Sequence, residues 1–199
     1  RSGSFYYGAG VDFKYLKPRT QSVIPDGSVY KVEENLASAV YMIYGEYARN
    51  LFSVKLKTTY GQNLSDYFML GGYGVHSVDP VTGKQKYTNF NYSNSWLDIT
   101  YGKKVMVGLM IGYSQNLGTN KELVAGKPVY AYGYEDGKLI DRMYRIVPSL
   151  MYNIHKWTLG IEYDLTTATY GDIKPKNGRT ENNYDVTNHR ALFVINYSF

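Results

Sequence analysis

The chain has 199 residues, of which 44% are hydrophobic and 20% are charged, and its formal net charge is +5. This composition is that of a folded chain, and the absence of cysteine excludes disulfides, thiolate metal sites and a cysteine nucleophile. The basic residues are scattered along the sequence, so we expect no nucleic-acid partner.

Helical membrane spans are not expected, because the longest apolar stretch, VMVGLMIGY at 105–113, has about half of the roughly 20 residues that such a helix needs. The first residues lead almost directly into a strand-like pattern. We therefore expect that a signal peptide has been removed or that the chain has been cut. Alternation of apolar and polar residues, which is typical of strands, is the dominant pattern throughout.

Eight segments show this alternation, the first, third, fifth and seventh of them strictly. In chain order they are 5–17, 34–48, 51–60, 95–101, 104–115, 140–153, 157–170 and 188–199. Pro148 would remove a ladder hydrogen bond from the sixth segment, so we expect a bulge or a local defect there.

The predicted connections are of two kinds. Tight turns are expected near Ala48, Gly102 and Ile154. Long polar segments rich in Gly, Asn, Asp and Pro connect the other strands, and they are 18–33, 62–94, 116–139 and 171–187. Because short and long connections alternate, we predict an up-and-down meander with all of its long loops at one end.

The polar positions of these strands carry charges of both signs: Asp12, Lys14, Glu46, Lys55, Lys57, Asp98, Arg145, Glu162, Asp164 and Arg190. A soluble barrel would bury this set at a cost of several kcal/mol for each unpaired ion, whereas a water-filled lumen would hydrate it. We therefore predict an all-β fold, an antiparallel transmembrane β-barrel with an apolar exterior, and we predict that the ten charged residues line its pore.

Aromatic residues are the second sign of a membrane barrel. The chain contains 23 tyrosines, and many of them fall near the predicted strand ends, where amphipathic rings occupy membrane interfaces. The alternative is that tyrosine is simply a good strand former. The closing strand presents Phe193, Ile195 and Tyr197 on one face and ends on Phe199, a pattern that resembles the assembly signal of outer-membrane barrels.

Several motifs resemble one family, the DcaP-like trimeric outer-membrane porins of Bacteroidetes. They are KPRT, YGQNLSDYFMLGGYGV, VDPVTGKQKYTNF, GYSQNLGT and TNHRALFVINYSF. The resemblance is to the C-terminal half of these proteins, and this sequence is about half of the expected length. It implies a barrel of about sixteen strands, wide enough for an aqueous channel. It also implies a homotrimer and passive diffusion of small hydrophilic or anionic solutes through the outer membrane of a Gram-negative bacterium. Lipopolysaccharide and the barrel assembly machinery are the other implied partners.

A small closed barrel of eight strands, with a structural, adhesive or binding role, is the alternative. Small inward residues such as Gly108, Gly112 and Ser149 would leave a narrow barrel poorly filled and favour the wider pore. Inward methionines, among them Met106 and Met110, could instead fill a narrow one.

The segment 62–94 is more apolar than a free surface loop, so we predict that it packs inside the lumen, as a constriction, or against a neighbouring subunit. Asp66, Tyr67 and His76 would then face Lys55, Lys57 and Arg145 across the pore and select solutes by charge. The alternative is a loop folded over the rim for stability.

Catalysis and cofactors are not expected. The three histidines are far apart in the sequence and none has metal-ligand spacing. His189 with Asp185 or Asp164 is the best candidate for a general-base pair at the rim, but a histidine near an acid is commonplace. We therefore predict that the protein is not an enzyme.

Overall fold

A computed structural model describes residues 3–199, and strands dominate this part of the chain. The long strands are β1 (Ser4–Leu16), β4 (Leu36–Arg49), β5 (Phe52–Gln62), β7 (Gln85–Gly102), β8 (Val105–Thr119), β11 (Lys138–Ile154), β12 (Trp157–Ile173) and β13 (Thr180–Tyr197). The short elements are β2 (Gln21–Val23), β3 (Val29–Lys31), the 3-10 helix η1 (Leu64–Tyr67), β6 (Gly71–Val78), β9 (Val129–Tyr132) and β10 (Tyr134–Glu135). In residues 3–199, no helix has the length and hydropathy to cross a membrane.

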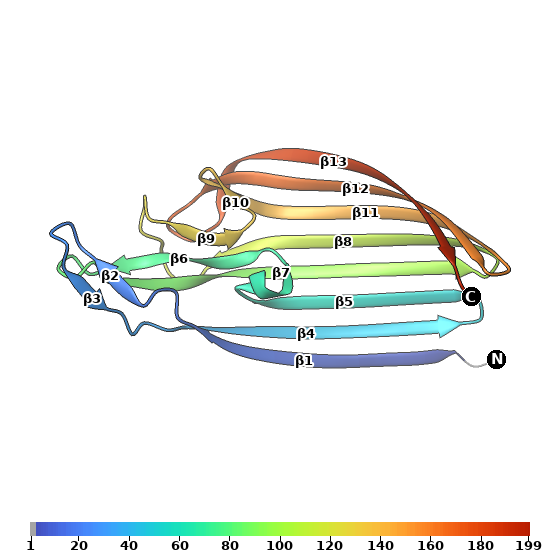
Figure 1. Cartoon of the computed structure of the whole chain (residues 1–199), viewed down its shortest axis with the longest axis horizontal. Coiled ribbons are helices and arrows are strands. Elements are labelled where there is room, and N and C mark those ends of the chain that lie inside the picture. Colours follow the sequence, from blue (N-terminus) through green and yellow to red (C-terminus); the bar gives the residue numbers. More distant parts are fainter. Residues whose placement is uncertain (1–2) are drawn as a thin grey trace.

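The eight long strands form one antiparallel sheet in which neighbours in the sequence are neighbours in space. The eight-stranded meander predicted from the alternation is therefore confirmed. Figure 1 shows β1 and β13 at the two edges of the sheet. These edge strands form no ladder with each other in residues 3–199, so the sheet is open and the described chain does not close a barrel.

Tight turns connect the strands at the end of the sheet where both termini lie (Figure 1). Arg49 pairs with Phe52, and Ile154 pairs with Trp157, so only two residues make each of these turns. The first residue of each turn, Asn50 or His155, has a φ near +50°, as the primed turns of tight hairpins require. The three turns that the sequence predicts are all present.

At the opposite end, the predicted long loops contain more strand than expected. β7 begins at Gln85, inside the predicted loop 62–94, and β6 pairs with it. β12 and β13 extend so far that 174–179 alone connect them, where the sequence predicts a loop over 171–187. The loop prediction failed because these strand ends are rich in polar residues, a composition typical of loops. Their side chains instead pair across the ladder, as the Thr167 and Thr187 hydroxyls do at 2.9 Å.

The remaining two predicted loops also contain short strands. β2 and β3 pair as a hairpin within 18–33, and β9 and β10 lie within 116–139. Both short strands of the second loop continue the sheet structure, since β9 pairs with β6 and β10 pairs with β11.

Pro148 leaves the expected gap in the ladder. Ile146 and Ser149 pair with β12, but the two residues between them have no partner on that strand. On the other side Pro148 pairs with Leu109 of β8, so the gap is confined to one edge of β11. The true register shift of this strand lies elsewhere, between Ile140 and Arg142.

The packed core lies at the loop end of the sheet. Phe90 and Tyr92 of β7 are completely buried there, together with Leu64 of η1 and Leu139 of β11. The Tyr92 hydroxyl donates a 3.2 Å hydrogen bond to the Ile140 carbonyl, which satisfies its buried polar group. The loops are therefore fixed to the strand ends by burial.

Candidate functional site

The strand register sorts the side chains of the sheet onto two faces, since directly opposed residues project to the same side. Glu46, Lys55 and Asp98 are successive partners across three strands, and Asp164 pairs with Arg190. All ten residues predicted to line the pore lie on this face, which we call the charged face: Asp12, Lys14, Glu46, Lys55, Lys57, Asp98, Arg145, Glu162, Asp164 and Arg190.

The opposite side, which we call the apolar face, has no Asp, Glu, Lys or Arg over the middle of the long strands. The spans without charge on this face are 5–15, 41–47, 52–60, 95–101, 105–113, 144–152, 157–165 and 189–197. Its side chains are nevertheless exposed: Phe13 retains 69% of its accessible surface. A continuous exposed apolar surface of this kind marks an interaction with something other than water.

Aromatic side chains gather on the apolar face near the tight turns. The Trp157 and Tyr197 rings lie 4.7 Å apart, and Lys156 lies over the Tyr197 ring at 6.0 Å. Phe193 and Ile195 of the closing strand are exposed on the same face, and Phe199 follows the strand. The predicted assembly signal thus forms one exposed stripe, and its role stays a prediction.

On β11, β12 and β13, the charged face holds a network of two arginines and two carboxylates. Arg145 binds Asp164 with two nitrogens, one of them the Nε donor at 3.0 Å from Oδ1. Arg190 Nη2 lies 3.3 Å from Asp164 and 3.6 Å from Glu162, and the Thr166 hydroxyl donates to Asp164 at 2.8 Å. The charges of this half of the face are mutually compensated.

The β4–β5–β7 part of the charged face is different. Lys55 and Glu46 form a loose pair at 3.7 Å, and both side chains are partly exposed. Lys57, on the same strand, forms no ion pair with any residue in 3–199. This region therefore carries a cation that is available to a solute.

The loop after β5 folds back over the charged face. Lys14 Nζ on β1 donates to the Asn63 carbonyl at 2.7 Å and to the Asp66 carboxylate at 2.6 Å. The Tyr67 hydroxyl donates to Asp12 Oδ2 at 2.6 Å. We call these four side chains, Asp12, Lys14, Asp66 and Tyr67, the η1 anchor, because they hold η1 against β1.

Backbone geometry also shapes this loop. The residues that flank η1, Asn63 and Phe68, both have left-handed φ angles, which are unusual for a bulky residue such as phenylalanine. Leu64 is fully buried under the loop, whereas Phe68 is almost fully exposed. The segment is therefore fixed at its base and presents its tip to the space over the sheet.

The η1 anchor alters the titration of one group. The hydrogen bond to Asp12 is the main cause that raises the pKa of Tyr67 to about 12, and partial burial and the Asp12 charge act in the same direction. Ionised tyrosine would lose its donor proton and face a carboxylate, so the neutral phenol is the form that the anchor requires.

Two of the three predicted constriction residues lie on the charged face. Asp66 and Tyr67 contact β1, although the sequence predicts Lys55, Lys57 and Arg145 as the residues that they face. Tyr67 does line a hollow of about 250 Å³ together with Lys57. The partners Asp12 and Lys14 were missed because they are about 50 residues away from the loop, and only the sheet topology brings them together.

His76, the third predicted constriction residue, lies on β6 at the loop end. Lys121 Nζ is 3.4 Å from its Nε2 atom. Burial is the main cause that lowers the pKa of His76, and the Lys121 charge adds to it. His76 is thus neutral at physiological pH and does not contact η1 through any hydrogen bond found in residues 3–199.

The candidate general-base pairs are not assembled. His189 lies on the apolar face, where its Nδ1 is 2.5 Å from the Tyr163 hydroxyl, while Asp164 lies on the charged face. Asp185 accepts a hydrogen bond from Thr169. Among the described residues, no group of three His, Cys, Asp or Glu side chains could hold a metal ion.

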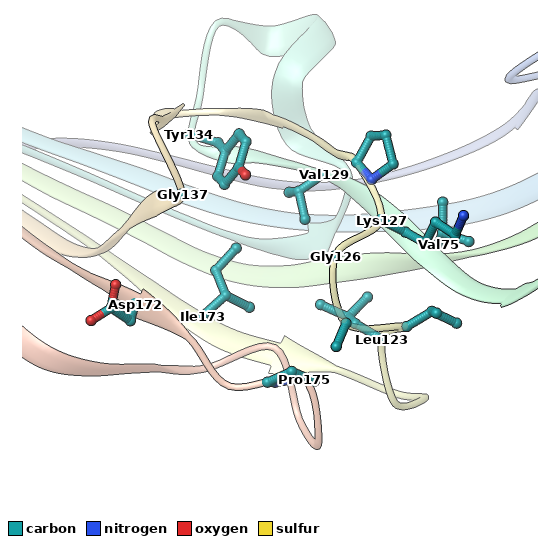
Figure 2. A pocket seen from close by; sticks show the side chains of 13 residues that line it. Val75, Leu123, Gly126, Lys127, Val129, Tyr134, Gly137, Asp172, Ile173 and Pro175 are labelled. Carbon is teal, nitrogen blue, oxygen red and sulfur yellow. The ribbon is translucent and has the colours of Figure 1, made fainter.

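A larger hollow, of about 430 Å³, lies between the loops at the end of β12. Figure 2 shows Ile173 and Val129 extending into it from opposite sides. Its one carboxylate, Asp172, is already bound to Lys138 at 2.5 Å and to Asn182 at 3.1 Å. Most of the other lining residues are apolar or glycine, so the hollow has the lining of a gap between packed loops.

Comparison with protein-family models, curated proteins and solved structures finds no match to this chain, so none of them identifies it as a DcaP-like porin.

Proposed function

We propose that this chain forms part of the wall and the constriction of an outer-membrane porin for small hydrophilic solutes. One observation carries the proposal: a single sheet has charges of both signs on one face and an uninterrupted, exposed apolar band on the other. Lipid contact explains the apolar band, and a water-filled lumen explains the charged face. The loop anchored on the charged face then narrows the pore.

The open sheet supports a wide pore. β1 and β13 leave unpaired edges, and long unpaired edges invite further strands. Because the chain contributes an even number of long strands, β1 and β13 are antiparallel, and further hairpins can continue the meander from either edge. We propose a barrel of about sixteen strands, assembled as a trimer of DcaP-like type, since about this number leaves an aqueous channel.

A small closed barrel with a structural, adhesive or binding role is the alternative. Large side chains on the charged face, such as Met42, Tyr44 and Met110, favour it because they could fill a narrow interior. It requires β1 to pair with β13, and these two strands form no ladder in residues 3–199.

Planar-bilayer recording with the purified full-length protein tests the proposal. We expect stepwise ion conductance and, in liposome swelling, entry of small sugars and organic acids. Removing the loop tip, residues 64–69, should raise the unit conductance if the loop narrows the pore. A protein that inserts into the bilayer without conducting would overturn the porin and favour the small barrel.

A further inference from the structure

One row of side chains on the charged face combines aromatic rings with the unpaired lysine. Tyr44 of β4 is directly opposite Lys57 of β5, and Lys57 is directly opposite Trp96 of β7. Adjacent strands are about 4.8 Å apart, so the Cα atoms of Tyr44 and Trp96 are about 10 Å apart, with the Cα atom of Lys57 between them. Tyr44 retains 48% and Trp96 36% of its accessible surface.

Glycines flank this row on both sides. Gly8 of β1 pairs with Tyr44, and a Cβ atom at Gly8 would collide with the Tyr44 ring. Gly112 of β8 pairs with Trp96, and a Cβ atom there would meet its nearest neighbour, the Arg145 Cβ, at 3.8 Å. The Tyr44 ring thus lies over Gly8 and fills the space above it, whereas the space over Gly112, beside Trp96, has no atom closer than 3.8 Å to the position of a Cβ.

A hollow of about 300 Å³ is lined by this row and its neighbours: Met42, Tyr44, Glu46, Lys55, Lys57 and Trp96. Its volume lies at the lower end of the range of about 300–1,000 Å³ typical of small-molecule sites. Trp96 and Tyr44 are both partly exposed in this hollow, and the face of an aromatic ring offers a contact surface to a ligand.

From this arrangement we infer that the hollow binds an acidic sugar, a uronic acid, on its passage through the pore. The inference rests on the proposed function and names its solute class. The C–H groups of a pyranose ring pack against the electron-rich faces of Tyr44 and Trp96. Lys57 pairs with the sugar carboxylate, since it forms no ion pair with any carboxylate in residues 3–199.

Glu46 and Lys55 distinguish a sugar acid from a simple aromatic acid. Their pair is loose at 3.7 Å, so the carboxylate is free to accept hydrogen bonds from sugar hydroxyls and the ammonium group to donate them. An aromatic acid would satisfy Lys57 but would press a ring without hydroxyls against Glu46, which desolvates this carboxylate without compensation.

Calorimetry and current recording on the full-length protein test the inference, with galacturonate, galactose and benzoate as probes. Galacturonate should bind and interrupt the ion current at a concentration about tenfold lower than galactose, which lacks the carboxylate for the charge-assisted contact with Lys57. It should also act at a lower concentration than benzoate, which desolvates Glu46 without compensation. Lys57→Gln and Trp96→Leu should each weaken the binding of galacturonate by about tenfold.

Two matched controls make the same changes elsewhere. Lys103→Gln removes one positive charge in a tight turn, and Trp157→Leu removes an indole from the apolar face, so both should leave galacturonate binding unchanged. Equal binding of galactose, tighter binding of benzoate, or equal effects of Trp96→Leu and Trp157→Leu would overturn the sugar-acid site.

The two readouts separate this inference from the proposed function. Conductance without galacturonate binding would overturn the sugar-acid site and keep the porin. Calorimetric binding without conductance would keep the site and overturn the porin.

Discussion

The loop end and the turn end of the sheet have opposite relations to water. At the loop end, Phe90, Tyr92 and Leu139 are fully buried under the short strands and η1. Toward the turns, the apolar face is exposed along every long strand. One end of the molecule thus makes its own core, and the other end has apolar side chains with nothing packed on them.

This difference shows where the two parts obtain their stability. The loop end gains free energy from burial within the chain, as in an ordinary globular protein. Along the strands, the same gain requires an apolar surrounding, and a bilayer provides it over the whole exterior. The proposed membrane placement therefore predicts unequal effects of equivalent substitutions at the two ends.

Phe90→Ala should have the largest effect, a loss of about 3–5 kcal/mol in the free energy of unfolding, because it empties a fully buried site. Phe13→Ala on the apolar face should cost much less, since the Phe13 side chain is mostly exposed and no side chain of the described residues covers it. Urea titration in detergent or lipid vesicles measures both. Equal losses at the two positions would contradict the separation of the two regions.

A charge placed on the apolar face gives the next largest effect and tests membrane contact directly. Leu109 and Met110 are adjacent on β8 and lie at the same depth, but they project to opposite faces. Leu109→Arg should reduce the stability in lipid by about 2–4 kcal/mol, the cost of arginine against the bilayer centre. Met110→Arg should be tolerated, because it faces the charged side opposite Asp98.

The measurement is folding into lipid vesicles followed by a urea titration, with the two variants compared side by side. A surface exchange in water usually changes stability by less than about 0.5 kcal/mol, so Leu109→Arg should be nearly neutral if that face meets water. Similar behaviour of the two variants would therefore argue against the bilayer.

The sequence was sufficient to predict the eight long strands and the face of the sheet on which each charged residue lies. Side chains alternate between the two faces along a strand, so the face of Lys55 or Asp164 follows from its position in its own strand and needs no knowledge of distant contacts. It was insufficient for the loop end. There, Thr and Asn residues such as Thr187 form ladder pairs in a composition typical of loops, and their pairing depends on the partner strand. The η1 anchor was missed for the same reason, since β1 and the loop meet only after the sheet has formed.

Alkaline titration of the η1 anchor should give the smallest effect, and it probes the loop that connects the two regions. The pKa of Tyr67 is raised from 10 to about 12, chiefly by its hydrogen bond to Asp12. A raised folded-state pKa means that the contribution of the anchor is complete below pH 10 and is lost as the pH rises from 10 to 12.

Difference spectroscopy of the wild type against Tyr67→Phe isolates this phenol from the other tyrosines. Asp12→Asn keeps a hydrogen-bond acceptor but removes the charge, so the pKa of Tyr67 should fall only part of the way toward 10 in this variant. Glu46→Gln, the same chemical change on the charged face away from the anchor, should leave it near 12. If Tyr67 titrated near 10 in the wild type, its phenol would not be held on Asp12, and the Lys14 contacts alone would hold the loop on β1. The proposed constriction would then lose one of the two side-chain contacts that fix η1 over the charged face.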